Sequence, residues 1–154
     1  MEEQIRESPL AKFLEGRGVG SCGETLDEIL SLDDQMLEAR HNYIQWLFPL
    51  DVPSEAVRDA PCLTAQDVNY VRASSLAHQN VMAAAHRMRA FYARNSHWLR
   101  PYDHNHLRIT RIIRSLRLLV GDTEAEEFKA FVLARVASAG RPVNARSLEF
   151  WESA

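Results

Sequence analysis

The sequence predicts an all-α protein, an irregular bundle of about five or six helices in a single domain. Three observations predict this class. Apolar residues recur at helical spacing in several segments, and residues typical of helix starts and stops bound those segments. No segment alternates apolar and polar residues as a half-buried strand does. The length of 154 residues, 46% of them hydrophobic, favours one domain over residues 1–154, with its core at about 24–137 and a partly flexible N-terminal segment at 1–23.

Short helices are predicted in the first part of the chain. Residues 5–15 form a weak amphipathic stretch, and a glycine-rich connector follows it. Thr25 and Glu28 have the spacing of a capping box, in which each side chain accepts a hydrogen bond from the backbone N–H of the other residue, so they predict a helix start. A second helix is predicted from Ser31 up to Pro49, because proline cannot continue a helix.

Longer helices are predicted in the middle of the chain. Thr64 starts a short helix, Ser74 starts a longer one, and the clearest helix is expected at Leu107–Val120, closed by Gly121 in a left-handed conformation. The apolar residues of this clearest helix fall within an arc of about 120°. They are Ile109, Ile112, Ile113, Leu116, Leu119 and Val120. Four of them are expected to share one core with further apolar residues, so that the core contains Ile109, Ile112, Ile113, Leu116, Trp46, Leu47, Met88 and Phe128.

The C-terminal part is expected to hold one more helix and a short turn. Thr123 and Glu126 repeat the capping-box spacing and predict the start of the helix. Gly140 is expected to end this helix, and Ser147–Trp151 indicates a short terminal turn.

Charge is unevenly distributed along the chain. Residues 1–67 contain 14 acidic and 5 basic residues, whereas residues 68–120 contain one acidic residue and nine arginines. Two interpretations fit these arginines. They pair with acidic residues of the first third, such as Asp33, Asp34 and Glu38, or they bind an anionic ligand through their planar guanidinium groups.

Composition also bears on the class of partner and on location. A nucleic-acid or other polyanion binder that uses the arginine-rich segment 87–117 is one alternative function, although a pI of about 6.1 is unlike that of a dedicated nucleic-acid domain. No apolar run approaches the roughly 18 residues of a membrane span, and the acidic N-terminus lacks a signal-peptide pattern. We therefore expect a soluble, cytoplasmic protein in which Cys22 and Cys62 are reduced.

The sequence predicts no metal site, no cofactor and no catalytic residue. His104 and His106, two positions apart on a helix, would point about 200° apart and so could not share a metal ion. No activated cysteine, nucleophile elbow or dinucleotide-binding pattern is present. An uncharacterised enzyme that uses the histidine cluster remains an alternative.

Two segments carry a resemblance to a known family. They are His41-Asn-Tyr-Ile-Gln-Trp-Leu-Phe-Pro49 and His104-Asn-His-Leu-Arg-Ile-Thr-Arg111, called the first string and the second string below. Together they resemble the conserved region of the opioid growth factor receptor family, over roughly residues 24–137. The resemblance implies a non-enzymatic binding domain, and the family's name implies an enkephalin-type peptide as ligand. It supplies no catalytic residues.

The two strings are expected to meet in one polar cluster. The first string is expected near the end of one helix and the second at the start of another, where backbone N–H groups and two imidazoles offer a site for a carboxylate or other anion. Two interpretations remain open: a buried polar cluster that only stabilises the fold, and a site for a peptide or carboxylate-bearing ligand. The candidate residues are His41, Tyr43, Gln45, Trp46, His104, Asn105, His106, Arg108 and Arg111.

Overall fold

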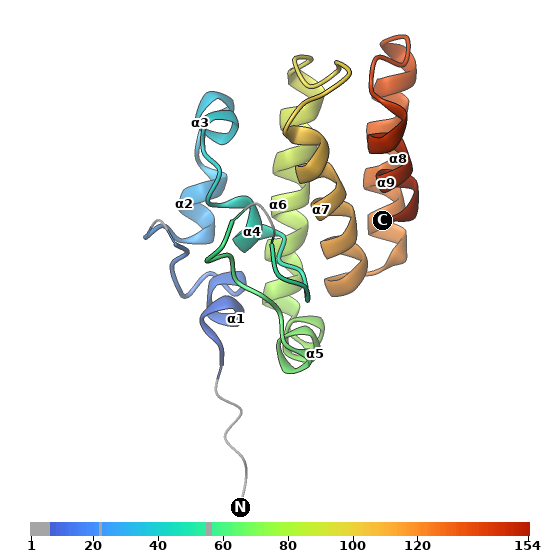
Figure 1. Ribbon diagram of the computed structural model, residues 1–154. Helices are drawn as coiled ribbons and strands as arrows, with labels where there is room; N and C mark the ends of the chain where they lie inside the picture. Colours follow the sequence, from blue (N-terminus) through green and yellow to red (C-terminus); the bar gives the residue numbers. More distant parts are fainter. Residues whose placement is uncertain (1–6, 22, 55–56) are drawn as a thin grey trace, which may run out of the picture. The chain divides into compact units, whose positions relative to one another are not determined.

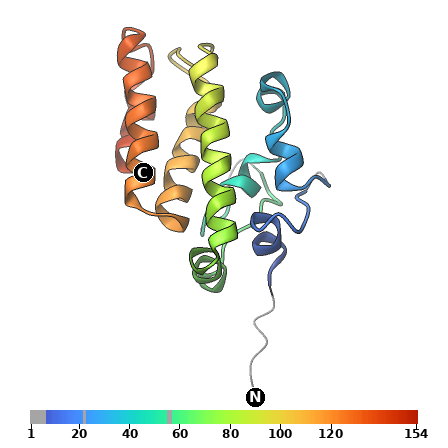
Figure 2. The same cartoon turned by 180° about the vertical axis from the view of Figure 1, so that it is seen from behind.

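The computed structural model describes residues 7–21, 23–54 and 57–154, and over these residues it contains nine helices and no strand (Figures 1 and 2). The all-α class predicted from the sequence is confirmed. The helices are α1 (Pro9–Leu14), α2 (Leu26–Leu30), α3 (Asp34–Ala39), α4 (Ile44–Leu47), α5 (Ala65–Ala73), α6 (Ser75–Arg94), α7 (Asn105–Leu119), α8 (Asp122–Ser138) and α9 (Ala145–Ser153). The chain divides into two compact units, Met1–Asn80 and Val81–Ala154, and the boundary falls within α6.

Capping boxes start two helices of the first unit, and both helices begin where Thr25 and Thr64 predicted a start. At α2, the Glu28 N–H donates to Thr25 Oγ1 at 3.2 Å, and the Thr25 N–H donates to Glu28 Oε1 at 3.1 Å. At α5, Thr64 and Asp67 exchange the corresponding bonds at 3.1 and 2.9 Å. Each pair satisfies backbone donors that the first turn of a helix leaves without partners.

The helix predicted from Ser31 to Pro49 is wrong, because the structure contains two short helices there. The Asp33 side chain caps α3 by accepting from the Met36 N–H at 2.8 Å, and α3 ends at Ala39. The Tyr43 hydroxyl donates to the Leu37 carbonyl at 2.7 Å, an acceptor that a continuous helix would pair with the N–H four residues further on. A side-chain donor thus takes up a carbonyl where the helix stops, and α4 begins only at Ile44.

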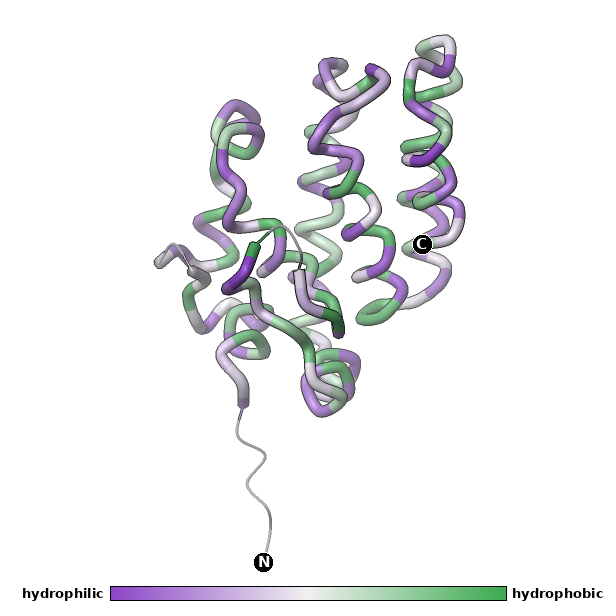
Figure 3. Tube along the Cα trace, in the orientation of Figure 1, coloured by the Kyte–Doolittle hydropathy of each residue, from purple (hydrophilic) through white to green (hydrophobic). Residues whose placement is uncertain are grey.

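In the second unit, α7 packs against α8 and α9 (Figure 1). Figure 3 shows hydrophilic and hydrophobic positions alternating along α7, as an amphipathic helix requires. Five members of its predicted apolar face are buried, and Val120 is half-buried. Among the described residues, no helix has both the length and the apolar composition needed to cross a membrane.

Two details of α8 differ from prediction. Gly121 has a φ of 164°, which is extended backbone and not the left-handed conformation, and it is the N-cap residue of α8. Helix α8 therefore begins at Asp122, so Thr123 lies inside it and forms no capping box. The Glu126 carboxylate accepts from Arg117 at 2.6 Å and from Lys129 at 3.2 Å, which takes it away from the helix start.

The C-terminal segment is a full helix, α9, rather than the predicted short turn. Gly140, with a φ of 81°, lies in the left-handed region just after α8, as expected for a helix end. Asn144 then caps α9 by accepting from the Ser147 N–H at 2.9 Å. Near the far end of α9, Lys129 Nζ donates to the Glu152 carbonyl at 3.0 Å, and Arg117 Nε donates to the Ala154 carbonyl at 3.1 Å.

Candidate functional site

The first string lies in the first unit, and only its middle part is helical. The sequence places the first string near the end of one helix, where His41 and Gln45, four residues apart, would share a face. In the structure His41 is exposed and precedes α4, so the two residues do not share a helix face. The i and i+4 relation holds only within one continuous helix, and the break after α3 removes it. Tyr43 is fully buried, and its hydroxyl bond to Leu37 accounts for its polar group.

Trp46 is half-buried, which differs from the fully buried position expected for a core residue. Its ring is nevertheless held on several sides within the first unit. Phe13 of α1 meets it edge-on, with ring centroids 5.3 Å apart, and Trp46 Nε1 donates to Ser21 Oγ at 2.7 Å. A Cβ added to Gly20 would lie 3.2 Å from Trp46 Cγ, so the glycine-rich connector runs close against the ring. The orientation of the indole is therefore fixed.

Gln45 differs from the other polar residues of the first string. It is only 7% exposed, and its Oε1 atom has no hydrogen-bond partner among the described residues. Leaving a buried acceptor unpaired costs about 1–3 kcal/mol. Native structures contain few such groups, and because the oxygen atom itself is enclosed, it offers no exposed contact for a ligand.

The second string lies in the second unit and is dominated by His106, which is 4% exposed. Its Nε2 lies 2.9 Å from the Trp98 carbonyl oxygen, and its Nδ1 lies 3.2 Å from Ser147 Oγ. A carbonyl only accepts, so Nε2 carries the proton, and in the neutral ring Nδ1 accepts from the serine hydroxyl. The His106 backbone carbonyl accepts from Trp151 Nε1 at 3.0 Å, so this one residue connects α7, α9 and the loop before α7.

Asn105 is completely buried, and its side chain also has partners. Its Oδ1 accepts from the Tyr92 hydroxyl at 3.1 Å, and its Nδ2 donates to Asp103 Oδ1 at 2.8 Å. Burial disfavours the charged form of Asp103, but hydrogen bonds from the backbone and side chain of Asn105 outweigh this effect. With the nearby charges of His104 and Arg100, they hold the pKa of Asp103 below its ordinary value. His104 itself is exposed.

Several arginines of the basic middle segment contact groups of their own unit. Arg100 pairs with Asp103 at 2.9 Å, and Arg117 bonds Asp122 as well as Glu126. The guanidinium of Arg89 lies over the Phe131 ring, 4.7 Å from its centroid. A nucleic acid is bound mainly through cationic side chains that contact its phosphates. These arginines already contact other groups of the protein, which weakens the nucleic-acid alternative. Arg108 is buried and Arg111 is half-buried.

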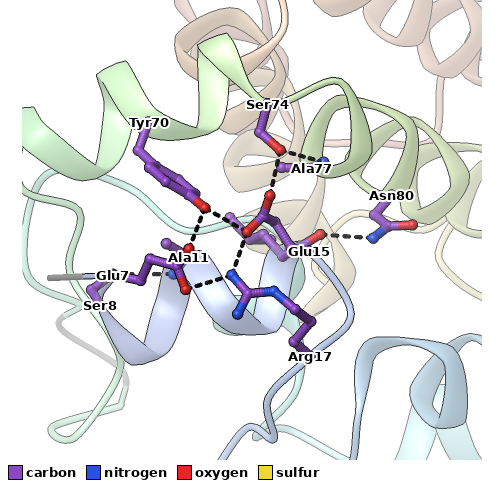
Figure 4. A network of polar contacts seen from close by, with 10 residues as sticks. Glu7, Ser8, Ala11, Glu15, Arg17, Tyr70, Ser74, Ala77 and Asn80 are labelled. Carbon is purple, nitrogen blue, oxygen red and sulfur yellow. Dashed lines mark hydrogen bonds and ion pairs between the residues drawn. The ribbon is translucent and has the colours of Figure 1, made fainter. Parts of the chain in front are cut away.

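The structure reveals a polar network that the sequence gave no reason to expect (Figure 4). Arg17 Nη2 lies 2.6 Å from both Glu7 Oε2 and Glu15 Oε1. The Tyr70 hydroxyl lies 2.8 Å from Glu7 Oε1 and 2.7 Å from Glu15 Oε1, and Ser74 Oγ donates to Glu15 Oε2 at 2.7 Å. The network joins α1 and the turn after it to α5 and the start of α6.

The groups of this network change one another's proton affinities. The hydrogen bond from Arg17, followed by that from Tyr70, lowers the pKa of Glu7 and of Glu15. The same contacts with Glu15 and Glu7 raise the pKa of Tyr70. About sixty residues separate Tyr70 from its carboxylate partners in sequence, so no local pattern could have identified this network.

The two strings lie in different units, so their meeting in one site stays a prediction. Each string is described by its own surroundings. The second string has its buried side chains bonded within its unit, at Asn105 and His106. The first string holds the half-buried Trp46, whose ring is in part accessible, next to Gln45, whose enclosed oxygen has no partner among the described residues. The first string is therefore the better candidate for ligand contact.

Comparison with known proteins identifies relatives of the chain. Residues 20–98 match the family model described as the opioid growth factor receptor (OGFr) conserved region, and this match includes the whole first string. The opioid growth factor receptor of Mus musculus is 34% identical over 113 residues, which cover 62% of this chain and 17% of that protein. The receptor of Homo sapiens is 32% identical over 116 residues, covering 62% and 16%.

A further relative is the opioid growth factor receptor-like protein 1 of Mus musculus, 31% identical over 128 residues, or 70% of this chain and 26% of that protein. The chain thus corresponds to between 16% and 26% of the length of these three relatives. No solved structure matches the chain.

Proposed function

The chain belongs to the opioid growth factor receptor conserved-region family, and we propose that it is a non-enzymatic domain that binds a peptide at the first string. Membership of this family supports a receptor-like interaction role. The relatives are named receptors for an opioid growth factor. By that name, the first ligand to test is an enkephalin-type peptide.

One structural observation carries the proposal, the position of Trp46. Tryptophan is enriched among the residues that dominate binding energy at interfaces. Phe13, Gly20 and Ser21 hold this ring in one orientation while part of it stays accessible. A side chain that is already ordered loses little conformational entropy when a partner packs against it, so such a ring is suited to be an anchor for a ligand.

The alternative of an enzyme that uses the histidine cluster receives less support. A general acid or base needs a ring nitrogen within reach of substrate. Both ring nitrogens of His106 already face partners, Trp98 and Ser147, and the side chain is buried. The arrangement is typical of a histidine that positions neighbouring segments.

The test is capture of a fluorescently labelled enkephalin-type peptide, measured by anisotropy. We expect binding to the wild-type protein, about tenfold weaker binding to Trp46→Ala, and unchanged binding to the control Tyr102→Ala, because Tyr102 is an aromatic residue of the other unit that is 78% exposed. Unchanged affinity of Trp46→Ala would place the peptide elsewhere.

A second readout needs no label on the peptide. Trp98 and Trp151 are fully buried, whereas Trp46 is half-buried, so acrylamide quenching of tryptophan fluorescence reports mainly on Trp46. Bound peptide should reduce the quenching. Raising the salt concentration should change this effect only modestly, whereas binding of a polyanion to the arginine-rich segment would weaken steeply. A steep dependence on salt would favour the polyanion alternative.

A further inference from the structure

The contacts described above that orient Trp46 come from one short segment of the first unit, α1 and the glycine-rich connector that follows it. Phe13 lies on α1, whereas Gly20 and Ser21 lie on the connector. The connector itself runs close against α1, since a Cβ added to Gly18 would lie 3.4 Å from the backbone nitrogen of Phe13. The orientation of the indole therefore depends on where α1 is held.

Helix α1 cannot fix its own position. It has six residues, and isolated helices shorter than about 12 residues are marginal in water, so contacts with other segments must hold it. It packs against α4 and α5. At its start, Ser8 Oγ donates to Asp67 Oδ1 at 2.6 Å, and at its end the Leu14 carbonyl accepts from Asn80 Nδ2 at 2.9 Å. The residue that ends it, Glu15, is attached through its side chain as well.

Glu15 makes the most extensive of these attachments (Figure 4). Its carboxylate accepts from Arg17 Nη2 at 2.6 Å, from the Tyr70 hydroxyl at 2.7 Å and from Ser74 Oγ at 2.7 Å. The bonds from Arg17 and Tyr70 lower the pKa of Glu15, so the carboxylate is ionised at neutral pH and both its oxygens accept. Tyr70 belongs to α5 and Ser74 directly precedes α6, so one side chain joins the end of α1 to both helices.

From this series of contacts we infer that Glu15 is a positioning residue for the proposed peptide site. It holds the end of α1, while α1 and the connector hold the Trp46 ring in one orientation. The inference rests on the proposed function and adds the group that orders its anchor. A ring that is already ordered loses less conformational entropy when a ligand binds. Loosening α1 should therefore weaken binding without removing any contact to the ligand.

The first experiment measures the exposure of Trp46 without ligand. Glu15→Ala removes all three bonds of the carboxylate, so acrylamide quenching of tryptophan fluorescence, which reports mainly on Trp46, should increase. Asp33→Ala is the matched control, because Asp33 is an acidic residue of the same unit whose carboxylate also accepts a bond, from the Met36 N–H. It should lower stability but leave the quenching at the wild-type value. Wild-type quenching in folded Glu15→Ala would overturn the inference.

A milder variant keeps this test decisive if circular dichroism shows that Glu15→Ala does not fold. Tyr70→Phe removes the hydroxyl that donates to Glu15 and keeps the ring. It should increase the quenching in the same direction but by less, because Glu15 retains its bonds from Arg17 and Ser74. If only Tyr70→Phe folds, wild-type quenching in this variant would overturn the inference.

The second experiment measures capture of the fluorescently labelled enkephalin-type peptide by anisotropy. Glu15→Ala should weaken binding about threefold in the wild-type background and have no further effect in the Trp46→Ala background, because it acts through this ring. A general loss of folded protein would instead reduce capture in both backgrounds equally. Asp33→Ala should bind as tightly as the wild-type protein. Equal losses in both backgrounds would overturn the positioning role.

The two experiments separate the possible failures. A wild-type protein that captures no peptide overturns the proposed function, whereas quenching of the ligand-free variants still tests whether Glu15 orients the ring. A wild-type protein that captures peptide, combined with unchanged quenching or with equal losses in both backgrounds, overturns the role of Glu15 alone. Increased quenching, together with a loss of affinity only in proteins that contain Trp46, supports the inference.

Discussion

The two strings that carry the family resemblance bury polar side chains in different ways. In the second string, the Asn105 amide bonds Tyr92 and Asp103, and the His106 ring lies between Trp98 and Ser147. In the first string, Gln45 is buried almost as deeply, yet its oxygen has no partner within the described residues.

The difference teaches that burial and polarity do not by themselves show how far folding satisfies the hydrogen bonds of a polar segment. Both strings are dense in polar and aromatic residues, and either could have been chosen from the sequence. The distinguishing quantity is the hydrogen-bonding capacity that remains unused after folding. The second string has used this capacity to hold loops and helices of its own unit together.

The largest expected effect tests the structural role of the second string. Trp151→Ala removes a fully buried indole and its bond to the His106 carbonyl, and we expect a loss of about 3–5 kcal/mol in the free energy of unfolding. Urea denaturation measures it. Phe150→Ala, at a more exposed position on the same helix, should cost much less, and equal losses would contradict the anchoring role of Trp151.

A smaller loss is expected for His106→Ala. The change leaves the Trp98 carbonyl and the Ser147 hydroxyl without their ring partner, so stability should fall by about 2 kcal/mol. Gln45→Met removes a buried oxygen that has no partner among the described residues, so it should raise stability instead, and this opposite sign sharpens the comparison of the two strings. His86→Ala, at an exposed position of α6, is the control in the same denaturation experiment. A His106→Ala variant with the same free energy of unfolding as the wild-type protein would contradict the structural role of this ring.

A double-mutant cycle tests whether the two strings, compared above as separate clusters, are energetically coupled. The sequence predicts that they share one site, so His41→Ala and His104→Ala should couple by at least about 0.5 kcal/mol in denaturant unfolding. Both side chains are exposed, which places the expected coupling at the low end of the usual range. Additive effects would mean that the strings act separately, each within its own unit.

The smallest effect concerns pH and the network around Arg17. The folded pKa values of Glu7 and Glu15 lie below the ordinary value of 4.5. The stabilisation they give is therefore present above about pH 4.5 and is lost as the pH falls through the lowered values. Solvent screens these side chains, so the gain is small.

Glu15→Gln should accordingly reduce stability at pH 7 and have little effect near pH 3, as measured by urea denaturation across this range. Glu149→Gln, at an exposed position of α9, is the control for the loss of one carboxylate. A difference between Glu15→Gln and wild type that does not depend on pH would contradict the assigned role of the network.

Local sequence signals predicted much of the fold, and they failed where another contact competed. Thr25 and Thr64 cap helices as predicted, because each has its acidic partner three residues on. Asp67 accepts from the Thr64 N–H through one oxygen, which leaves the other oxygen for Ser8 Oγ. At Thr123, the same spacing failed because Glu126 bonds Arg117 and Lys129 instead. Likewise, the Tyr43 hydroxyl donates to the Leu37 carbonyl, which in a longer helix would accept from a backbone N–H.

The site was less predictable than the fold. The sequence indicated the residues of both strings. It could not show that both ring nitrogens of His106 have partners while the Gln45 oxygen has none within the described part of the chain, because this depends on contacts between distant segments. The bond between Trp151 and the His106 carbonyl spans 45 residues. The network of Glu7, Glu15 and Tyr70 depends on separations longer still, and only folding brings these groups together.

The attachment of α9 has a consequence for how its sequence can vary. Lys129 and Arg117 reach the main-chain carbonyls of Glu152 and Ala154, not their side chains. Nearly any amino acid at these two positions would present the same carbonyl oxygens. Alanine scanning of α9 would therefore overlook both contacts, and they would be detected only by replacing the cations on α7 and α8. In related sequences, we expect the amino acids at positions 152 and 154 to vary while the same two hydrogen bonds hold the helix in place.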